Sequence, residues 1–370
     1  MPSIIPKNLL YAEEYILLEL QQHPLEALEL WAGYFTEFRK KGQYDLCQRL
    51  LKNIKGHHLP EHGMGIVKYS EGWLYDRIGR WQEAITAYKK CLDSFHQSKI
   101  FGLDAEIWAD IGSIYQDQGY WNEAETAYQT ARSTAEEQGD RKTLGNVLNN
   151  LAGLHEAKNE TEVAKQYILI AIEILKEAGD QYNTAAALAN LGTLLATQNQ
   201  PQEALNKFVE ALEIFQNIED LHGIGMALAS IARLYYLINK NMEARLQYQE
   251  ALSFFIQVND HVQINKTLAN LGLVLQEEGD MEQAREYFEQ ALRGYLDYGD
   301  QHGAVTCQVS LGNLLYQVGN VEQSIEFISK AHILSRKFGF EDQIDRMKLL
   351  LPNGLIKQAE LKVETQWNMK

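Results

Sequence analysis

Three asparagines stand at one position of a repeating pattern, where their side chains could hold an extended peptide. Asn150, Asn190 and Asn270 are separated by forty residues or by twice that number. A carboxamide carries both a hydrogen-bond donor and an acceptor, so it can pair with the backbone of a bound chain in either direction. Alternatively, each asparagine bonds to the neighbouring repeat and helps to stack the units, because a buried amide needs a partner in either case. The sequence alone leaves both interpretations open.

Other side chains near these positions would give the site its charge and its apolar contacts. Besides the three asparagines, the candidates for ligand contact are Arg233, Lys266, Trp73, Tyr236 and Asn313. Most of the acidic candidates come earlier in the chain: Asp76, Glu106, Asp110, Asp117 and Glu156. A short peptide with basic residues at one end and an acidic or carboxylate group at the other would fit this distribution. The alternative is that these charges form a solvated surface, as scattered acids commonly do.

No pattern in the sequence is typical of an enzyme. The stretch GIGMALA at 223–229 lacks the third glycine and the preceding strand of a nucleotide-binding loop. His57, His58 and His62 lie close together, but no second cluster of ligands accompanies them, so we interpret them as surface histidines and not as a zinc site. The motifs of serine hydrolases, zinc proteases and phosphate-binding loops do not occur. We therefore expect no catalytic residue, no metal ion and no cofactor.

Composition and charge exclude several classes of function. The formal net charge of −16 argues against nucleic acid, because phosphate binding needs clustered cations. No apolar stretch approaches the ~20 residues of a membrane span, and an acidic pair interrupts the segment where a secretory signal would continue. Cys47, Cys91 and Cys307 are far apart and odd in number, as expected of reduced, buried thiols. We expect a cytoplasmic protein without nucleic-acid or membrane partners.

The elements that position these residues repeat with a period of forty residues. Small side chains keep this spacing through seven units: Ala84, Ala124, Ala164, Ala204, Ala244, Ala284 and Ser324. Such a period is typical of stacked repeats and not of a single globular core. Within one unit, Trp108, Ile111 and Tyr115 share one face of a helix. Gly112 on that face would let a second helix approach closely, since a larger side chain there would overpack the pair.

The opposite face of each first helix is predicted to stay uncovered, and we call it the free stripe. Helical spacing assigns four residues of every unit to it. From residue 181 onward, the free stripe comprises Ala186, Asn190, Thr193, Thr197, Met226, Ser230, Arg233, Leu237, Lys266, Asn270, Leu273, Glu277, Thr306, Ser310, Asn313 and Gln317.

Turn residues mark both ends of the predicted helix pairs. Glycine and asparagine most readily take the left-handed conformation that ends a helix. Within the pairs, these residues are Gly42, Gly79, Gly119, Asn159, Asn199, Asn239, Gly279 and Gly319. Aspartates at the junctions between units can cap the first helix of the next unit. They are Asp140, Asp180, Asp220, Asp260 and Asp300.

The repeating unit has the consensus W/L-x-x-L-G-x-x-Y, followed by alanine, an aromatic residue and alanine. This consensus resembles the tetratricopeptide repeat (TPR) family in its forty-residue form. The stretches VLNNLAGL, ALANLGTLL and TLANLGLVL look most like the subset found in kinesin light chain and the Leu-Gly-Asn repeat adaptors. The resemblance implies an all-α, right-handed superhelical solenoid of about eight helix-turn-helix repeats with terminal capping helices. It also implies a concave groove that binds peptides, with asparagines that pair with the bound backbone.

The repeats divide the chain into three parts. We predict that residues 1–24 form an N-terminal capping helix, mainly over 7–22, and that residues 25–342 form the repeat array. The first repeat, residues 25–51, is divergent, as end repeats tend to be. An irregular link over 55–64 is predicted to join it to the regular units.

The C-terminal part, residues 343–370, is predicted to form a capping helix and a tail. Met347, Leu350 and Leu351 should close the apolar core that the last repeat leaves open. Pro352 then breaks this helix, and a short further helix can follow before the chain frays.

The leading hypothesis for function is a non-enzymatic scaffold or adaptor that holds a peptide or a partner protein in its groove. A second hypothesis is a peptide-responsive bacterial regulator resembling the Rap family of quorum-sensing receptors. That family places a helical effector domain before its repeats, whereas here the repeats begin near Pro24 and leave about one helix for such a domain. A third hypothesis is a structural protein that forms a homo-oligomer, with its groove empty or filled by its own tail.

Overall fold

The computed structural model describes residues 16, 18–20, 23–40, 43–55, 57, 59–100 and 102–368 of the chain. Every regular element in these ranges is an α-helix. The capping helix predicted over 7–22 lies almost wholly outside the described residues, and so does the predicted turn residue Gly42. None of the helices in the described ranges is both long and apolar enough to span a membrane.

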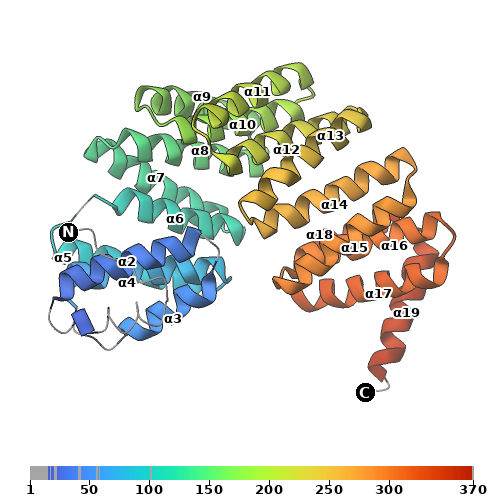
Figure 1. Ribbon diagram of the computed structural model, residues 1–370, viewed down its shortest axis with the longest axis horizontal. Coiled ribbons are helices and arrows are strands. Elements are labelled where there is room, and N and C mark those ends of the chain that lie inside the picture. Colours follow the sequence, from blue (N-terminus) through green and yellow to red (C-terminus); the bar gives the residue numbers. More distant parts are fainter. Residues whose placement is uncertain are drawn as a thin grey trace. The chain divides into compact units, whose positions relative to one another are not determined.

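Helices that follow each other in the sequence pack together in pairs (Figure 1). The first helices of the pairs are α2 (Pro24–Lys40), α4 (Glu61–Arg77), α6 (Asp104–Asp117), α8 (Arg141–Ala157), α10 (Gln181–Thr197), α12 (Leu221–Leu237), α14 (His261–Glu278) and α16 (Gln301–Gln317). The second helices are α3 (Tyr44–Ile54), α5 (Trp81–Gln97), α7 (Trp121–Gln138), α9 (Thr161–Glu177), α11 (Pro201–Asn217), α13 (Asn241–Gln257), α15 (Met281–Asp297) and α17 (Val321–Phe338). Two further helices follow, α18 (Glu341–Leu350) and α19 (Asn353–Asn368). This order confirms the predicted all-α array of helix-turn-helix units, although the irregular link predicted over 55–64 is shorter because α4 begins at Glu61.

The chain divides into two compact units, Met1–Ala187 and Leu188–Lys370, and the boundary falls inside α10. In the first unit, Trp31 and Leu50 lie in an apolar cluster built from α2, α3 and α4, and Trp31 Nε1 donates a hydrogen bond to Leu50 O at 3.1 Å. In the second unit, buried clusters such as that around Tyr248 join α12, α13 and α14. Within each unit, the core is therefore shared between neighbouring helix pairs, as in repeat proteins generally.

A glycine on several first helices makes room for a bulky side chain of the second helix. A β-carbon on Gly112 would lie 2.6 Å from Tyr128 Cδ1, and one on Gly272 would lie 2.7 Å from Phe288 Cε1. Carbon atoms in contact prefer separations of about 3.5–4.0 Å, so any side chain at these positions would displace the aromatic ring. The predicted close approach of the two helices is therefore confirmed.

Backbone conformations at the turns also confirm the predicted pattern. The turn residues predicted within the pairs and present in the described ranges all have positive φ: Gly79, Gly119, Asn159, Asn199, Asn239, Gly279 and Gly319. At the junctions between pairs, Lys99 (φ 58°) and Glu219 (φ 56°) take the same left-handed conformation. The residue types at these two positions did not indicate a left-handed conformation, because lysine and glutamate rarely adopt it.

The predicted capping aspartates all receive a hydrogen bond from the backbone N–H three residues later. Asp140 Oδ1 accepts from Thr143 N at 3.1 Å, and Asp300 Oδ1 accepts from Gly303 N at 2.8 Å. The same bond occurs at the other junctions that were predicted, at Asp180, Asp220 and Asp260. These caps fix where each first helix begins, and therefore fix which of its residues belong to the free stripe.

The C-terminal end differs from the prediction in one respect. Met347 and Leu351 are buried as predicted, but Leu350 is 38% exposed and does not close the core. Helix α19 packs on α17 instead, and it places Leu355 and Ile356 in the last apolar cluster. Because α19 covers the core, the part of α18 that carries Leu350 remains accessible.

Candidate functional site

Two hollows of the second unit lie on the free stripe, and we call them the small pocket and the groove. The small pocket, of about 80 Å³, is lined by Thr193, Ala196, Thr197, Phe208, Ser230, Arg233, Leu234 and Leu237. The groove, of about 470 Å³, is lined by Tyr236, Leu273, Gln276, Glu277, Ser310, Asn313, Gln317, Arg346, Leu349 and Leu350. The groove falls within the ~300–1,000 Å³ typical of ligand sites, whereas the small pocket is below that range.

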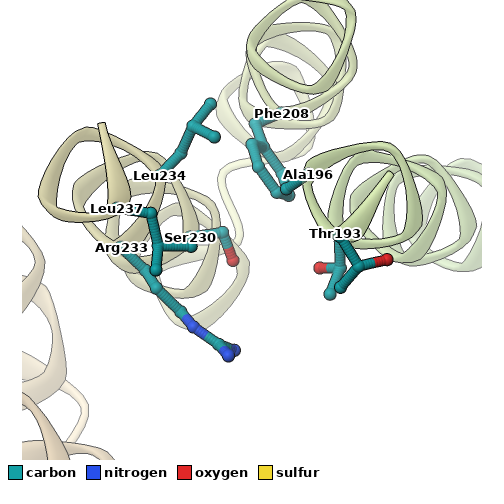
Figure 2. Close-up of a pocket in the computed structure, with 8 residues that line it drawn as sticks. Thr193, Ala196, Phe208, Ser230, Arg233, Leu234 and Leu237 are labelled. Carbon is teal, nitrogen blue, oxygen red and sulfur yellow. The ribbon is translucent and has the colours of Figure 1, made fainter. Parts of the chain in front are cut away.

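The small pocket has an apolar interior and a polar rim. Figure 2 shows the Phe208 ring between the helices that carry Ala196 and Leu234, while Arg233 extends away from that ring. The hydroxyls on the rim donate to their own helices: Thr193 Oγ1 to Ala189 O at 3.1 Å, and Ser230 Oγ to Met226 O at 3.0 Å. Each hydroxyl oxygen keeps a free acceptor site. The pocket can therefore receive one apolar side chain of a ligand whose backbone stays at the rim.

The groove is lined by four helices that are successive in the repeat order, α12, α14, α16 and α18. Gln276 Nε2 donates to Gln317 Oε1 at 2.9 Å, which joins α14 to α16. Arg346 Nη2 donates to Ser310 Oγ at 3.3 Å, which joins α18 to α16. Leu349 is 84% exposed and lines the groove beside them, so the lining combines amide groups, a guanidinium and an uncovered apolar side chain.

The free stripe of the second unit and its continuation on α18 carry three cations without ion-pair partners among the described residues. Among the described residues, no carboxylate forms an ion pair with Arg233, Lys266 or Arg346. Arg346 is half-buried, and this burial lowers the pKa of its guanidinium. Burial and the charge of Glu277 raise the pKa of the Tyr236 hydroxyl, so that side chain stays neutral near pH 7. The stripe is therefore locally positive in a chain of net charge −16.

Three of the predicted contact residues line these hollows, and three others of the second unit lie on the stripe outside them. Arg233 lines the small pocket, while Tyr236 and Asn313 line the groove. The remaining three, on α10 and α14, are Asn190, Lys266 and Asn270.

The two interpretations of the asparagines differ in the hydrogen bonds that they require. Within the described part of the chain, the carboxamides of Asn270 and Asn313 make no hydrogen bond to protein. The stacking interpretation requires such a bond, so these two half-buried carboxamides do not support it.

In the first unit, the predicted contact residues have different surroundings. Trp73 is only 9% exposed, and its ring packs against Phe35 and Tyr44, with the Arg39 guanidinium 4.8 Å from the ring centre. Its ring is therefore covered by side chains of the chain itself. Asn150 lies half-buried on α8 and, like Asn270, has no hydrogen-bond partner among the described residues.

Three of the acidic side chains of the first unit, Glu106, Asp110 and Asp117, are partly desolvated. Burial raises the pKa of Asp110 to about 6, against the opposing effect of a hydrogen bond with Tyr88. Burial also raises the pKa of Glu106 and of Asp117. No group of three or more histidine, cysteine or acidic side chains in the described part of the chain is arranged to hold a metal ion.

Sequence reasoning missed Arg346, Leu349 and Leu350 as part of the site. Arg346 stands two periods after Lys266, and Leu350 two periods after Asn270, so both continue the free stripe onto α18. The prediction treated that helix only as a cap and did not extend the forty-residue spacing to it.

The helix pairs and their shared core define a helical repeat protein. The family profile described as tetratricopeptide repeat matches residues 103–177, 146–217, 183–257 and 263–337, and a second profile with the same description matches residues 72–94. These matches cover more than half of the chain, which therefore belongs to the tetratricopeptide repeat family. No curated protein matches the sequence.

Several solved structures have the same fold. The apo form of the quorum sensor NprR from B. thuringiensis is 12% identical, with a TM-score of 0.59, over 88% of this chain and 98% of that chain. A Rap protein complexed with Competence and Sporulation Factor is 13% identical, with a TM-score of 0.57, over 96% of this chain and 99% of that chain. The Rap conjugation gene regulator of the plasmid pLS20, in complex with the Phr peptide, is 16% identical, with a TM-score of 0.58, over 80% and 79%. At these identities the likeness establishes the fold alone.

Proposed function

We propose that this protein is a non-enzymatic scaffold that binds a peptide segment of a partner along the free stripe of its second unit. The observation that carries the proposal is the pair of carboxamides, Asn270 and Asn313, that have no hydrogen-bond partner within the described residues. Asn313 lines the groove from α16, and Asn270 lies outside the groove on the free stripe of the preceding first helix, α14. An extended peptide presents N–H and C=O groups that would satisfy them.

The remaining features of the stripe fit a peptide better than a small molecule. The small pocket accepts a single apolar side chain, and the groove accepts a longer segment. Arg233, in the small pocket, and Lys266, on the stripe outside both hollows, add positive charge, which favours a ligand with an acidic group. Asn190 extends the candidate contacts of the second unit to α10, whereas Asn150, on α8, belongs to the first unit.

The test uses a peptide selected on the full-length chain from a phage-displayed library, with its affinity measured by fluorescence anisotropy. Asn270→Ala and Asn313→Ala should each weaken binding by about 1 kcal/mol, or roughly fivefold, because each removes one hydrogen bond. Gln290→Ala is the matched control, since it removes an exposed carboxamide from the second helix α15. Unchanged affinity in both asparagine variants, with folding preserved, would contradict the proposal.

A second candidate function is a regulator that changes conformation when a peptide binds. The observation that favours it is the fold match to a Rap protein over 99% of the length of that chain, in a structure solved with Competence and Sporulation Factor. Small-angle scattering with and without the selected peptide separates the two candidates. A regulator of this type should become more compact on binding, whereas a rigid scaffold should keep its radius of gyration.

A further inference from the structure

We propose that α19 is an acid-releasable cap, which stays docked on α17 while His332 is neutral and detaches when that ring takes up a proton. This inference goes beyond peptide binding, because it concerns the C-terminal end of the array and not the free stripe. It rests on the polar character of a helix contact that is apolar in the preceding repeats.

The first step concerns two polar side chains that are buried on α17. His332 is 3% exposed and Ser335 is fully buried. Earlier repeats carry larger apolar side chains at the same two positions: Leu212, Leu252 and Leu292 for His332, and Phe215, Phe255 and Tyr295 for Ser335. Leu252 and Leu292 pack in apolar clusters that include residues of the next first helix. The last second helix therefore lacks the side chains that join neighbouring pairs elsewhere in the second unit.

The second step concerns how α19 is held on this helix (Figure 1). His332 Nε2 lies 3.2 Å from Glu360 Oε1. Ser329 Oγ, one turn earlier, donates to Ile325 O at 2.7 Å and lies 3.3 Å from Ala359 O. Leu355 and Ile356 supply the apolar part of the contact. The histidine thus lies where α19 meets α17, and its state of protonation bears directly on that contact.

The third step concerns the second nitrogen of the ring. Because Glu360 accepts a hydrogen bond, the neutral ring carries its proton on Nε2 and leaves Nδ1 as an acceptor. His332 Nδ1 is buried and has no hydrogen-bond partner among the described residues. A second proton would place an N–H donor there, on a charged ring, with no acceptor in contact with it. Burial of such a donor is costly, so the docked state disfavours the protonated ring.

The fourth step concerns the charges around this ring. Arg336 of α17 repels the protonated ring, and Glu360 of α19 attracts it. Within the described part of the chain, α16 and α18 place no charge that acts on His332, although Lys348 of α18 acts on Glu360. Burial and Arg336 outweigh Glu360, so the pKa of His332 lies below its ordinary value of 6.5.

The sign of the pH dependence follows from this lowered pKa. When α19 detaches, the ring is solvated and regains its ordinary pKa, so the detached state binds more protons than the docked state. The contact therefore keeps its full stability above pH 6.5 and loses part of it as the pH falls below that value.

The test measures hydrogen exchange in the full-length chain at about pH 7.5 and about pH 5.5 by mass spectrometry. Exchange rates are divided by those of an unstructured chain at the same pH, so that only opening of the helix is compared. Uptake of one proton changes an equilibrium by at most about tenfold per pH unit. Opening of α19 should therefore increase by up to about tenfold at the lower pH, while opening of α13 should stay the same.

Substitutions of His332 identify the group that takes up the proton. His332→Leu restores the residue type of the earlier repeats, and His332→Gln keeps a neutral hydrogen-bond donor for Glu360. Both should abolish the pH dependence of α19. His261→Gln is the matched control, because His261 is an exposed histidine at the start of α14 that stacks on Tyr298, and it should preserve the dependence.

Several outcomes would overturn the cap, and none of them reaches the peptide-binding proposal. Equal protection of α19 at both pH values in the wild type would do so, and so would absence of protection at either pH. A pH dependence that survives in both His332 variants would assign the proton to another group. Equal loss of protection in α13 would mean that the whole unit opens and not the cap alone.

Discussion

The left-handed backbone at Glu219 tests how the junctions between repeats are stabilised. Glu219 has a φ of 56°, whereas five of the six equivalent junctions carry glycine or asparagine, at Gly139, Gly179, Asn259, Gly299 and Gly339. For a residue with a β-carbon this conformation costs about 1–2 kcal/mol, and glycine loses about 0.5–1 kcal/mol of conformational entropy on folding. Glu219→Gly should therefore stabilise the junction between α11 and α12 by about 0.5–1 kcal/mol.

Native-state hydrogen exchange is the appropriate assay, because repeat arrays open locally and not as one unit. Glu219→Gly should slow exchange in the first turn of α12 by about two- to fivefold. Glu219 is exposed and precedes the capping residue Asp220 in an acidic chain, so the loss of its charge is a competing explanation. Glu219→Gln and Glu219→Ala remove the charge and keep the β-carbon. Equal protection in these controls would refute the backbone argument.

Two further predictions concern the contacts within and between repeats. Gly272→Leu should destabilise the α14–α15 pair by about 1–3 kcal/mol, because even a β-carbon at residue 272 would lie 2.7 Å from Phe288 Cε1. Hydrogen exchange of the two helices measures this loss, and unchanged exchange would contradict the packing. His222 Nε2 lies 3.0 Å from Asp260 Oδ2, and that bond raises the pKa of His222 above its ordinary value of 6.5. A histidine whose pKa is higher in the folded state than in the unfolded state stabilises the folded state below pH 6.5, and this contribution is lost as pH rises through the folded-state pKa. Protection of the first turn of α14 against exchange should therefore fall as pH rises above 6.5. His222→Gln should remove this dependence on pH.

Much of the fold could be predicted from the sequence, because equivalent positions of every repeat must meet the same need, such as a tight turn or a close helix contact. Asn159, Asn199 and Asn239 were predicted as turns from residue type, and each has a positive φ. Gly112 and Gly272 were predicted from the need for close helix packing, and each faces an aromatic ring at a distance that excludes a side chain. Local preference and global period agree at these sites, so each could be predicted separately.

The ends of the array could not be predicted in the same way, because their contacts do not repeat. The ring of Trp73 is covered by Phe35 and Arg39 of the divergent first repeat, and the forty-residue period does not predict these contacts. Leu350 is exposed because α19 packs on α17 and covers the core that Leu350 was expected to close. Because Leu350 is exposed, this part of α18 lines the groove. The wrong prediction that Leu350 closes the core therefore also left α18 out of the candidate site.

The most direct test of peptide binding on the free stripe is photo-crosslinking of a selected peptide, followed by mass spectrometry of the modified residues. The peptide would carry a benzophenone side chain at successive positions in separate experiments. We expect adducts on α12, α14, α16 and α18, including Leu273 and Leu349 in the groove. Adducts confined to the second helices, such as α13 and α15, would contradict the account.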